Sequence, residues 1–302
     1  MRRKLNRQTN ILLRVGYHTL IKFIIKVIPE NRSGDKLVSF INFVDKHRRF
    51  PTKSLLFNDV LYQIMTTNEI IDPLRIFVSD KEFVKLYVKA VVGEEYNVPT
   101  IDVLRNVKEV EIYDFPANCC IKATQTSGSV ILRKNNETID IEKIKSWFSI
   151  NYYRNQREAN YKTLKPKVIV EPLLFNNPNL IDYKFFCYKG KPNLIQVDVD
   201  RYIDHRRKFF DSNWKELDFS TCYKRADKNI EMPDNFDQML NIASKLSAGF
   251  SFVRVDIYSD GKSCMVGEIT NCSGGAGEKF IPSNSEKLAS EIVFNCLTAV
   301  IS

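Results

Sequence analysis

Residues 251–271 read SFVRVDIYSDGKSCMVGEITN. Two runs rich in apolar residues, 252–258 and 263–269, are typical of strands. The Ser259-Asp260-Gly261 sequence between them has the composition of a tight turn. This stretch therefore predicts a β-hairpin near the end of the chain.

The hairpin also brings together charged side chains. Arg254 and Asp256 are two residues apart and lie on one face of the first strand, and Glu268 lies on the returning strand. Carboxylates from paired strands repel each other unless a cation lies between them, and Mg²⁺ prefers oxygen ligands. Arg254 supplies a fixed positive charge for a phosphate or a developing oxyanion. The hairpin predicts a magnesium site, and the simpler alternative is a salt bridge between Arg254 and one of the acids.

Upstream segments extend the same architecture. Strands 183–188 and 193–199 flank a Lys-Gly-Lys-Pro turn, and helices are expected at 236–247 and 285–300. A helical pattern runs from about 57 to 92, and 167–171 is a compact strand. Helices and paired strands in this order predict an α+β fold with mixed sheets, not a doubly wound parallel sheet.

Residues 118–133 predict a further hairpin. Lys122 ends its first strand, and residues 124–129 form a small, hydroxyl-rich tip. Backbone amides and hydroxyl groups at such a tip can surround phosphate oxygens while Lys122 supplies charge. The chain has neither a P-loop nor a dinucleotide-binding glycine motif. A glycine cluster, Gly274, Gly275 and Gly277, follows Glu268 and allows a ligand to approach the backbone closely.

Composition excludes several classes of protein. The chain has 302 residues, 44% of them hydrophobic and 27% charged, which is typical of a folded globular protein. It has no run of about 18 apolar residues that would span a membrane. Its seven cysteines are scattered without a CxxC pair, and its three histidines are far apart. We therefore expect a cytoplasmic protein with reduced thiols and no zinc site.

Positive charge is concentrated at the N-terminus. Residues 1–32 contain eight basic residues and one acid, whereas the remainder accounts for only +2 of the net charge of +9. A nucleic-acid-binding protein would not concentrate its charge in this way. Residues 11–28 alternate a basic and an apolar stripe at helical spacing. This segment predicts an amphipathic helix that lies on an anionic membrane surface or, alternatively, packs on the protein body.

Several ordered segments between about residues 45 and 282 resemble the TupA-like branch of the ATP-grasp superfamily. They are SDKEFVKLYVKAVVGEEYNVPT, CCIKATQTSGSVIL, KPKVIVEPLL, DYKFFCYKGKPNLIQVDVDRYIDHRRKFFD, FVRVDIY and GEITN. The resemblance implies two α+β lobes that hold ATP between them. Many TupA-like chains have a loop similar to KCNHGSG where this chain has KATQTSG. Many superfamily members have Asn where this chain has Thr270, with Asn271 next to it.

The resemblance also implies roles for individual residues. Lys81 and Lys122 resemble the lysines that contact ATP phosphates, and Lys184 a further nucleotide-contacting lysine. The closing loop is expected at Ser127, Gly128 and Ser129, and the adenine hinge at Glu171, Pro172, Leu173 and Leu174. The expected metal ligands are Asp256, Glu268 and Asn271. Arg254 and Lys184 are the expected catalytic residues, with Arg254 stabilising the transferred phosphoryl group.

A polar cluster follows the strand at 193–199. In the ATP-grasp interpretation Asp198, Arg201, His205 and Arg207 line the acceptor side, where arginines hold an acidic sugar. A solvated charged loop is the simpler alternative. Asp198 and Asp200 also satisfy the DxD pattern of glycosyltransferases, which binds a metal and a nucleotide sugar.

The resemblance implies an ATP-dependent carboxylate–amine ligase that uses ATP and Mg²⁺. The substrates it suggests are an amino acid and a uronic-acid carboxyl of a bacterial surface polysaccharide. The alternatives are a glycosyltransferase that uses Asp198 and Asp200, and a non-catalytic adaptor. We expect an N-terminal helical region at 1–48, an N-terminal subdomain at 49–116, a phosphate-loop lobe at 117–175 and a catalytic lobe at 176–302. Residues 1–32 would bind the inner face of the plasma membrane.

Overall fold

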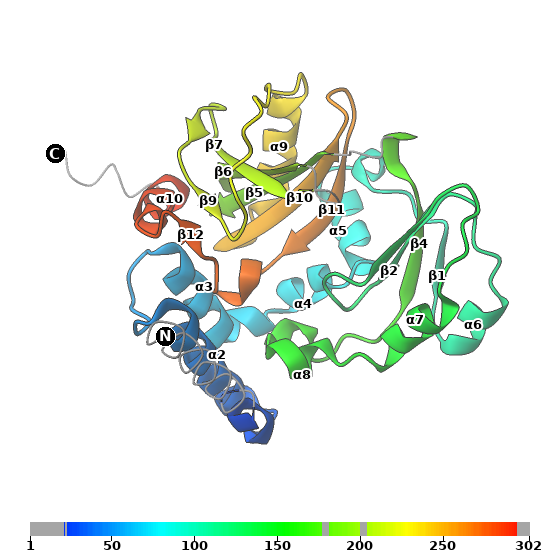
Figure 1. Cartoon of the computed structure of the whole chain (residues 1–302), viewed down its shortest axis with the longest axis horizontal. Helices are drawn as coiled ribbons and strands as arrows, with labels where there is room; N and C mark the ends of the chain where they lie inside the picture. The colour runs from blue at the N-terminus through cyan, green and yellow to red at the C-terminus, as the bar shows by residue number, and fades with distance from the viewer. Residues whose placement is uncertain (1–20, 22, 177–180, 200–203, 295–302) are drawn as a thin grey trace, which may run out of the picture.

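A computed structural model describes residue 21 and residues 23–176, 181–199 and 204–294 (Figure 1). Two antiparallel sheets with their own helices form its two lobes, which lie side by side in Figure 1. A short pairing of β9 (Ser220–Thr221) with β12 (Phe280–Ile281) lies beside the larger sheet. The structure confirms the expected α+β fold.

The larger sheet has the strand order β11-β10-β5-β6-β7-β8. Its strands are β5 (Ile181–Tyr188), β6 (Lys191–Val199), β7 (Arg206–Asp211), β8 (Glu216–Leu217), β10 (Phe252–Ser259) and β11 (Cys264–Thr270). The turns predicted at 189–192 and 259–261 connect β5 to β6 and β10 to β11, as expected. A bulge after Asp256 shifts the register of the β10–β11 pair.

The two faces of this sheet bury different side chains. On one face Phe185, Ile195 and Val255 pack with the amphipathic helix α9 (Phe236–Ser247). On the other face Phe186 and Phe252 pack under α3 (Phe57–Thr66) and α10 (Ser285–Phe294). That second apolar core covers only one end of its face, because charged side chains occupy the other end.

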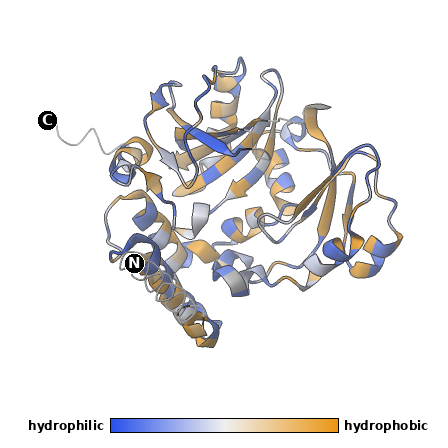
Figure 2. Cartoon of the chain, viewed as in Figure 1, coloured by the Kyte–Doolittle hydropathy of each residue, from blue (hydrophilic) through white to orange (hydrophobic). Residues whose placement is uncertain are grey.

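The smaller sheet has the order β1-β4-β2-β3. Its strands are β1 (Asp102–Leu104), β2 (Cys119–Ala123), β3 (Val130–Arg133) and β4 (Val168–Pro172). One face packs on α6 (Val107–Ile112), α7 (Ile141–Ser146) and η3 (Trp147–Ser149) around buried Ile121, Ile144 and Trp147. Figure 2 shows the hydrophobic residues gathered along these strands. The opposite face of β2 and β4 carries Lys122 and Glu171 beside buried Cys120 and Ile169.

Short helices lie between the strands and between the lobes. They are η1 (Asn68–Ile71), α4 (Pro73–Ser79), α5 (Phe83–Val91), η2 (Glu94–Tyr96), α8 (Tyr152–Gln156), η4 (Ala159–Tyr161), η5 (Leu174–Asn176) and η6 (Ser273–Gly275). The segments α4 and α5 lie against β11 of the larger sheet. The predicted division of the chain into four parts stays a prediction, although the pairing of β1 with β4 joins residues 102–104 to the phosphate-loop lobe.

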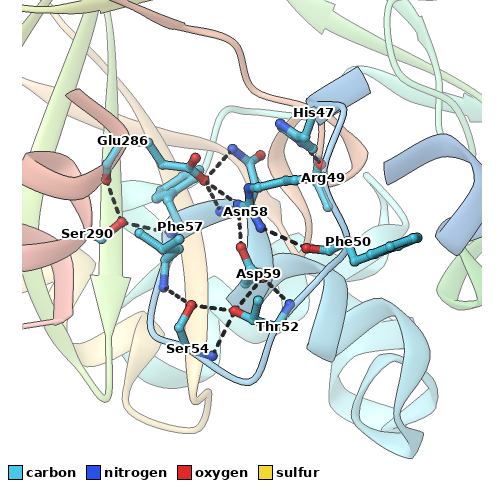
Figure 3. A network of polar contacts seen from close by, with 12 residues as sticks. His47, Arg49, Phe50, Thr52, Ser54, Phe57, Asn58, Asp59, Glu286 and Ser290 are labelled. Carbon is cyan, nitrogen blue, oxygen red and sulfur yellow. Dashed lines mark hydrogen bonds and ion pairs between the residues drawn. The ribbon is translucent and has the colours of Figure 1, made fainter. Parts of the chain in front are cut away.

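The N-terminal helix α2 (Arg32–His47) is fastened to the C-terminal lobe. Asn31 caps its first turn, and Arg48 ends it with a left-handed backbone (φ 56°). Beyond it, the buried carboxylate of Asp59 binds Arg49 and the amide of Thr52, and Asn58 donates to Glu286 of α10 at 2.8 Å (Figure 3). This network fixes the end of α2 beside the larger sheet.

The expected amphipathic helix at 11–28 lies largely outside the described residues, of which only 21 and 23–28 belong to it. In the part of the chain that the structure describes, every helix is too short or too polar to cross a membrane.

Candidate active site

The site lies on the charged end of the larger sheet. Strand alternation points the even-numbered side chains of β5, β6 and β10 to one face, and Glu268 and Thr270 of β11 join them on the near side of the bulge. Across this face the charged and polar residues form a continuous row: Asp198, Gln196, Asp182, Lys184, Arg254, Asp256 and Glu268. Lys184 and Arg254 lie among the carboxylates of the row, and Arg207 pairs with Asp198 at its end, so that most of the buried carboxylates have a cation beside them.

Asp256 is the centre of the row. Arg254 donates to both of its oxygens, with Nε 2.6 Å and Nη2 2.7 Å away, and Lys184 donates to the second oxygen at 2.9 Å. Although burial raises it, the pKa of Asp256 is held below its usual value by Arg254 and Lys184. Lys184 also pairs with Asp182. The salt bridge considered for Arg254 is therefore present, and it lies inside the expected site.

The second expected metal ligand is in register with the first. Glu268 is the cross-strand partner of Asp256, and Thr270 is the partner of Arg254 and accepts its hydrogen bond at 3.0 Å. Asn271 is not brought to this site. Its buried amide accepts from Arg75 at 2.9 Å and donates to Ser79 at 3.0 Å, so both ends are satisfied by α4.

Two lysines, one on the smaller sheet and one on α5, meet at Glu171 beside this row. Lys122 on β2 and Lys85 on α5 each contact one oxygen of Glu171 at 2.6 Å. Although burial raises it, the pKa of Glu171 is lowered by the two lysines. The ammonium of Lys122 lies 5.9 Å from the ring centroid of Tyr258, which belongs to β10 of the larger sheet. The charged faces of the two sheets therefore meet.

The accessible tip of the β2–β3 hairpin contains fewer residues than the range 124–129 that the sequence predicted. Thr124 and Thr126 are buried, whereas the three residues 127–129 form the accessible tip. Lys81 donates from its side chain to the carbonyl of Thr126 at 2.5 Å. Gly128 has a φ of 81°, a conformation that favours glycine. Lys81 thus braces the hairpin beside its tip.

The expected hinge follows β4. Glu171 and Pro172 end that strand, and Leu173 and Leu174 lead into η5. The expected hinge would therefore start at the carboxylate held by Lys122 and Lys85.

The expected acceptor cluster is partly paired within itself. Arg207 on β7 donates to Asp198 at 2.7 Å and to the hydroxyl of Thr221 at 2.7 Å. The ring of His205 lies 3.9 Å from that of Tyr223 and 3.4 Å from Asp198. Asp198 is buried, and its neutralisation by Arg207 does not favour the DxD interpretation. Arg201 and Asp200 lie outside the described residues.

Sequence reasoning missed two groups at this site. Lys85 lies on an amphipathic helix, where a lysine is normally solvated. Glu158 follows α8, is 7% exposed and lies electrostatically close to Glu268. Burial raises the pKa of Glu158 to about 7, with Lys46 opposing the shift and Glu268 adding to it. A buried acid with a shifted pKa is typical of functional sites, but no sequence pattern around Glu158 indicates its burial.

The residues present fit a magnesium ion that arrives with a nucleotide. Among the described residues no group of three His, Cys, Asp or Glu side chains could hold a metal. Mg²⁺ commonly uses one or two carboxylates and completes its shell with phosphate oxygens and water. Asp256 and Glu268 supply that pair of carboxylates.

Solved ligases show a distant likeness to the chain. D-alanine–D-alanine ligase from Helicobacter pylori has 17% identity and a TM-score of 0.39, over 73% of this chain and 61% of that one. The ligase from Bacillus anthracis has 18% identity and a TM-score of 0.40, over 73% and 65%. The macrocyclase MdnC from Microcystis aeruginosa has 10% identity and a TM-score of 0.37, over 78% and 68%. The chain thus spans less than two thirds of the two D-alanine–D-alanine ligases, and no curated protein matches it.

The family is established by sequence. The TupA-like ATP-grasp family matches residues 62–293, which is most of the chain. The match confirms the expected resemblance and the expected ATP-grasp fold. The protein belongs to the TupA-like ATP-grasp family.

Proposed function

We propose that the protein joins a carboxylate to an amine at the expense of ATP. A carboxylate oxygen attacks the γ-phosphorus of ATP, and ADP leaves. The amine nitrogen then attacks the acyl carbon of the resulting acyl phosphate and phosphate leaves, while the ammonium form of the amine loses two protons. The products are an amide, ADP and phosphate.

The observation that supports this proposal best is the opposition of two charged faces. Lys122 on the smaller sheet faces Tyr258 on the larger one, next to Asp256 and Lys184. Lysines on one side and a carboxylate pair on the other suit a magnesium–nucleotide complex between them. In this arrangement Lys81 and Lys122 hold phosphates, residues 127–129 close over them and Glu171–Leu174 receive the adenine.

Arg254 is the residue assigned to chemistry. Its half-buried guanidinium donates to Asp256, Ser273 and Thr270, which fix its orientation. A cation held rigidly stabilises the charge that develops on the transferred phosphoryl group and on the tetrahedral intermediate. Lys184, held by Asp182 and Asp256, adds a second fixed charge.

The proposed substrates are a uronic-acid carboxyl of a bacterial surface polysaccharide and an amino acid. TupA-like proteins are associated with such polymers, so a capsule, O-antigen or teichuronic-type glycan is the proposed product. The acceptor side would be formed by Asp198, Arg201, His205 and Arg207. A lipid-linked acceptor would place the enzyme on the inner face of the membrane, with residues 1–32 against anionic lipid.

ADP release by the full-length protein tests the reaction. ATP, Mg²⁺ and a panel of uronic acids are combined with each standard amino acid, and hydroxylamine replaces the amino acid in a parallel series to trap acyl phosphate as hydroxamate. We expect ADP and hydroxamate with at least one uronic acid. Asp256→Asn should abolish both, whereas Asp237→Asn, on the exposed side of α9, should not. Consumption of a UDP-sugar without ADP release would instead indicate a glycosyltransferase, and inactivity in both assays an adaptor.

A further inference from the structure

The end of α2 lies against the glycine-rich loop that follows Glu268. The ring of His47 contacts the carbonyl of Ala276 at 2.8 Å, and the ammonium of Lys46 is 3.4 Å from the carbonyl of Gly274. A Cβ on Gly277 would lie only 2.3 Å from that ammonium. Lys46 is thus seated on the loop, and it comes from a helix outside the residues that match the family.

Glu158 lies on the same loop. Its carboxylate is 3.7 Å from the position of a Cβ on Gly275, and its side chain is almost completely buried. Among the described residues its carboxylate has neither a hydrogen bond nor an ion pair, and the nearby charges that act on it are Lys46 and Glu268. Only 7% of the residue is exposed, yet its oxygens are not among the fully enclosed polar atoms, so a cationic ligand can reach this carboxylate.

Two tyrosines complete the surroundings of Glu158. Tyr152 and Tyr161 pack edge to face with their centroids 4.7 Å apart, and both lie close enough to Glu158 and Glu268 to interact with them electrostatically. Aromatic rings beside a carboxylate are a favourable environment for an ammonium group.

We propose that Glu158, with Tyr152 and Tyr161, binds the ammonium group of the amine substrate, and that Lys46 binds the carboxylate of the same molecule. This inference rests on the proposed ligase function and specifies its amine as an amino acid. Lys46 and Glu158 are oppositely charged and both lie beside the glycine-rich loop, and the structure gives no ion pair between them. A zwitterion that bridges the two side chains satisfies both, and it lies next to Glu268, where the acyl phosphate must form.

Direct binding to the full-length protein tests the inference without any reaction. Each standard amino acid is titrated calorimetrically in the presence of Mg²⁺ and a non-hydrolysable ATP analogue. Every amino acid that binds is then compared with its decarboxylated amine and its deaminated acid, for example alanine with ethylamine and propionate. We expect the amino acid to bind roughly 10- to 100-fold more tightly than either fragment, because two charge-assisted contacts are made.

Two variants separate the contacts. Lys46→Met should weaken binding of the amino acid until it equals the binding of its decarboxylated amine, whose own affinity should not change. Glu158→Gln should weaken the binding of the amino acid and of the amine to a similar extent. Lys36→Met on the exposed face of α2 and Glu231→Gln in an exposed loop are the matched controls and should bind as wild type does. Unfolding midpoints establish that the variants are folded.

The possible outcomes distinguish a failure of this inference from a failure of the proposed ligase reaction. If no amino acid binds the wild type, or if folded Lys46→Met and Glu158→Gln bind it normally, the inference is wrong. Hydroxamate formation from a uronic acid in that case would leave the ligase function intact. Binding that depends on both side chains, without hydroxamate from any uronic acid, would support the inference and count against the proposed carboxylate.

Discussion

Arg254 shows at the scale of one residue how the site divides binding from chemistry. Both oxygens of Asp256 and the hydroxyls of Ser273 and Thr270 already hold its guanidinium in place. We expect Arg254→Ala to lower kcat by about 10²- to 10³-fold, because a fixed donor is lost where charge develops. The KM for ATP should change little.

Steady-state ADP release at saturating substrates measures that effect. Lys122→Ala is the comparison, because its ammonium belongs to the phosphate-binding side and its loss should raise the KM for ATP. An Arg254→Ala enzyme with normal kcat and a raised KM would show that the arginine only binds nucleotide.

At the scale of elements, Glu171 couples β4 to β2 and α5. Its carboxylate carries a lowered pKa because Lys122 and Lys85 oppose the effect of burial. The stabilisation by this carboxylate is therefore complete above its usual pKa of 4.5 and is lost as pH falls through the lower folded value. Glu171→Gln should cost about 3 kcal/mol at pH 7, since it leaves buried lysines without a counter-charge.

Urea unfolding of the wild type and Glu171→Gln between pH 7 and pH 3 tests this coupling. The difference in unfolding free energy should be constant down to about pH 4.5 and shrink below it. Glu231→Gln, an exposed substitution, should show no such trend. A difference that grows as the pH falls would mean that Glu171 is not held as a carboxylate by the lysines.

At the scale of the whole molecule, we expect the first 35 residues to serve two purposes: the part near Pro29 stabilises the fold, and the part before it binds membrane. Arg157 is buried and donates to the carbonyl of Pro29 at 3.0 Å while it pairs with Asp35 at 3.3 Å. The segment around Pro29 is therefore part of the body. Removal of residues 1–22 should leave the unfolding midpoint unchanged, whereas removal of 1–34 should cost about 2 kcal/mol or more, because Arg157 keeps Asp35 but loses the backbone carbonyls of Ile28 and Pro29.

The same shortened chains test the membrane proposal. Full-length protein should sediment with phosphatidylglycerol vesicles at low salt and dissociate as salt rises, because lipid attraction to basic residues is screened. The chain without residues 1–22 should remain in solution. Equal sedimentation of both chains would show that another surface binds the vesicles.

Local patterns predicted the hairpins, whereas distant contacts decided the rest of the site. The turns at 189–192 and 259–261 specify neighbouring strands, so Asp256 and Glu268 could be paired from sequence. Lys85 and Glu158 depend on burial by segments far away in the chain, and nothing local marks them. Asn271 follows Thr270 directly, but its side-chain amide forms hydrogen bonds with Arg75 and Ser79 of α4. Only the folded chain reveals these contacts.

The pairing of Asp256 with Arg254 and Lys184 has a consequence for the order of assembly. A free divalent ion meets a carboxylate whose charge is already cancelled, so it gains little by entering alone. A nucleotide changes this balance, since its triphosphate competes for the two cations and delivers the ion already chelated. Calorimetry should show no heat with Mg²⁺ alone and clear binding of Mg–ATP. Cellular Mg²⁺ would then leave the resting enzyme untouched, and loading of the site would follow the nucleotide supply.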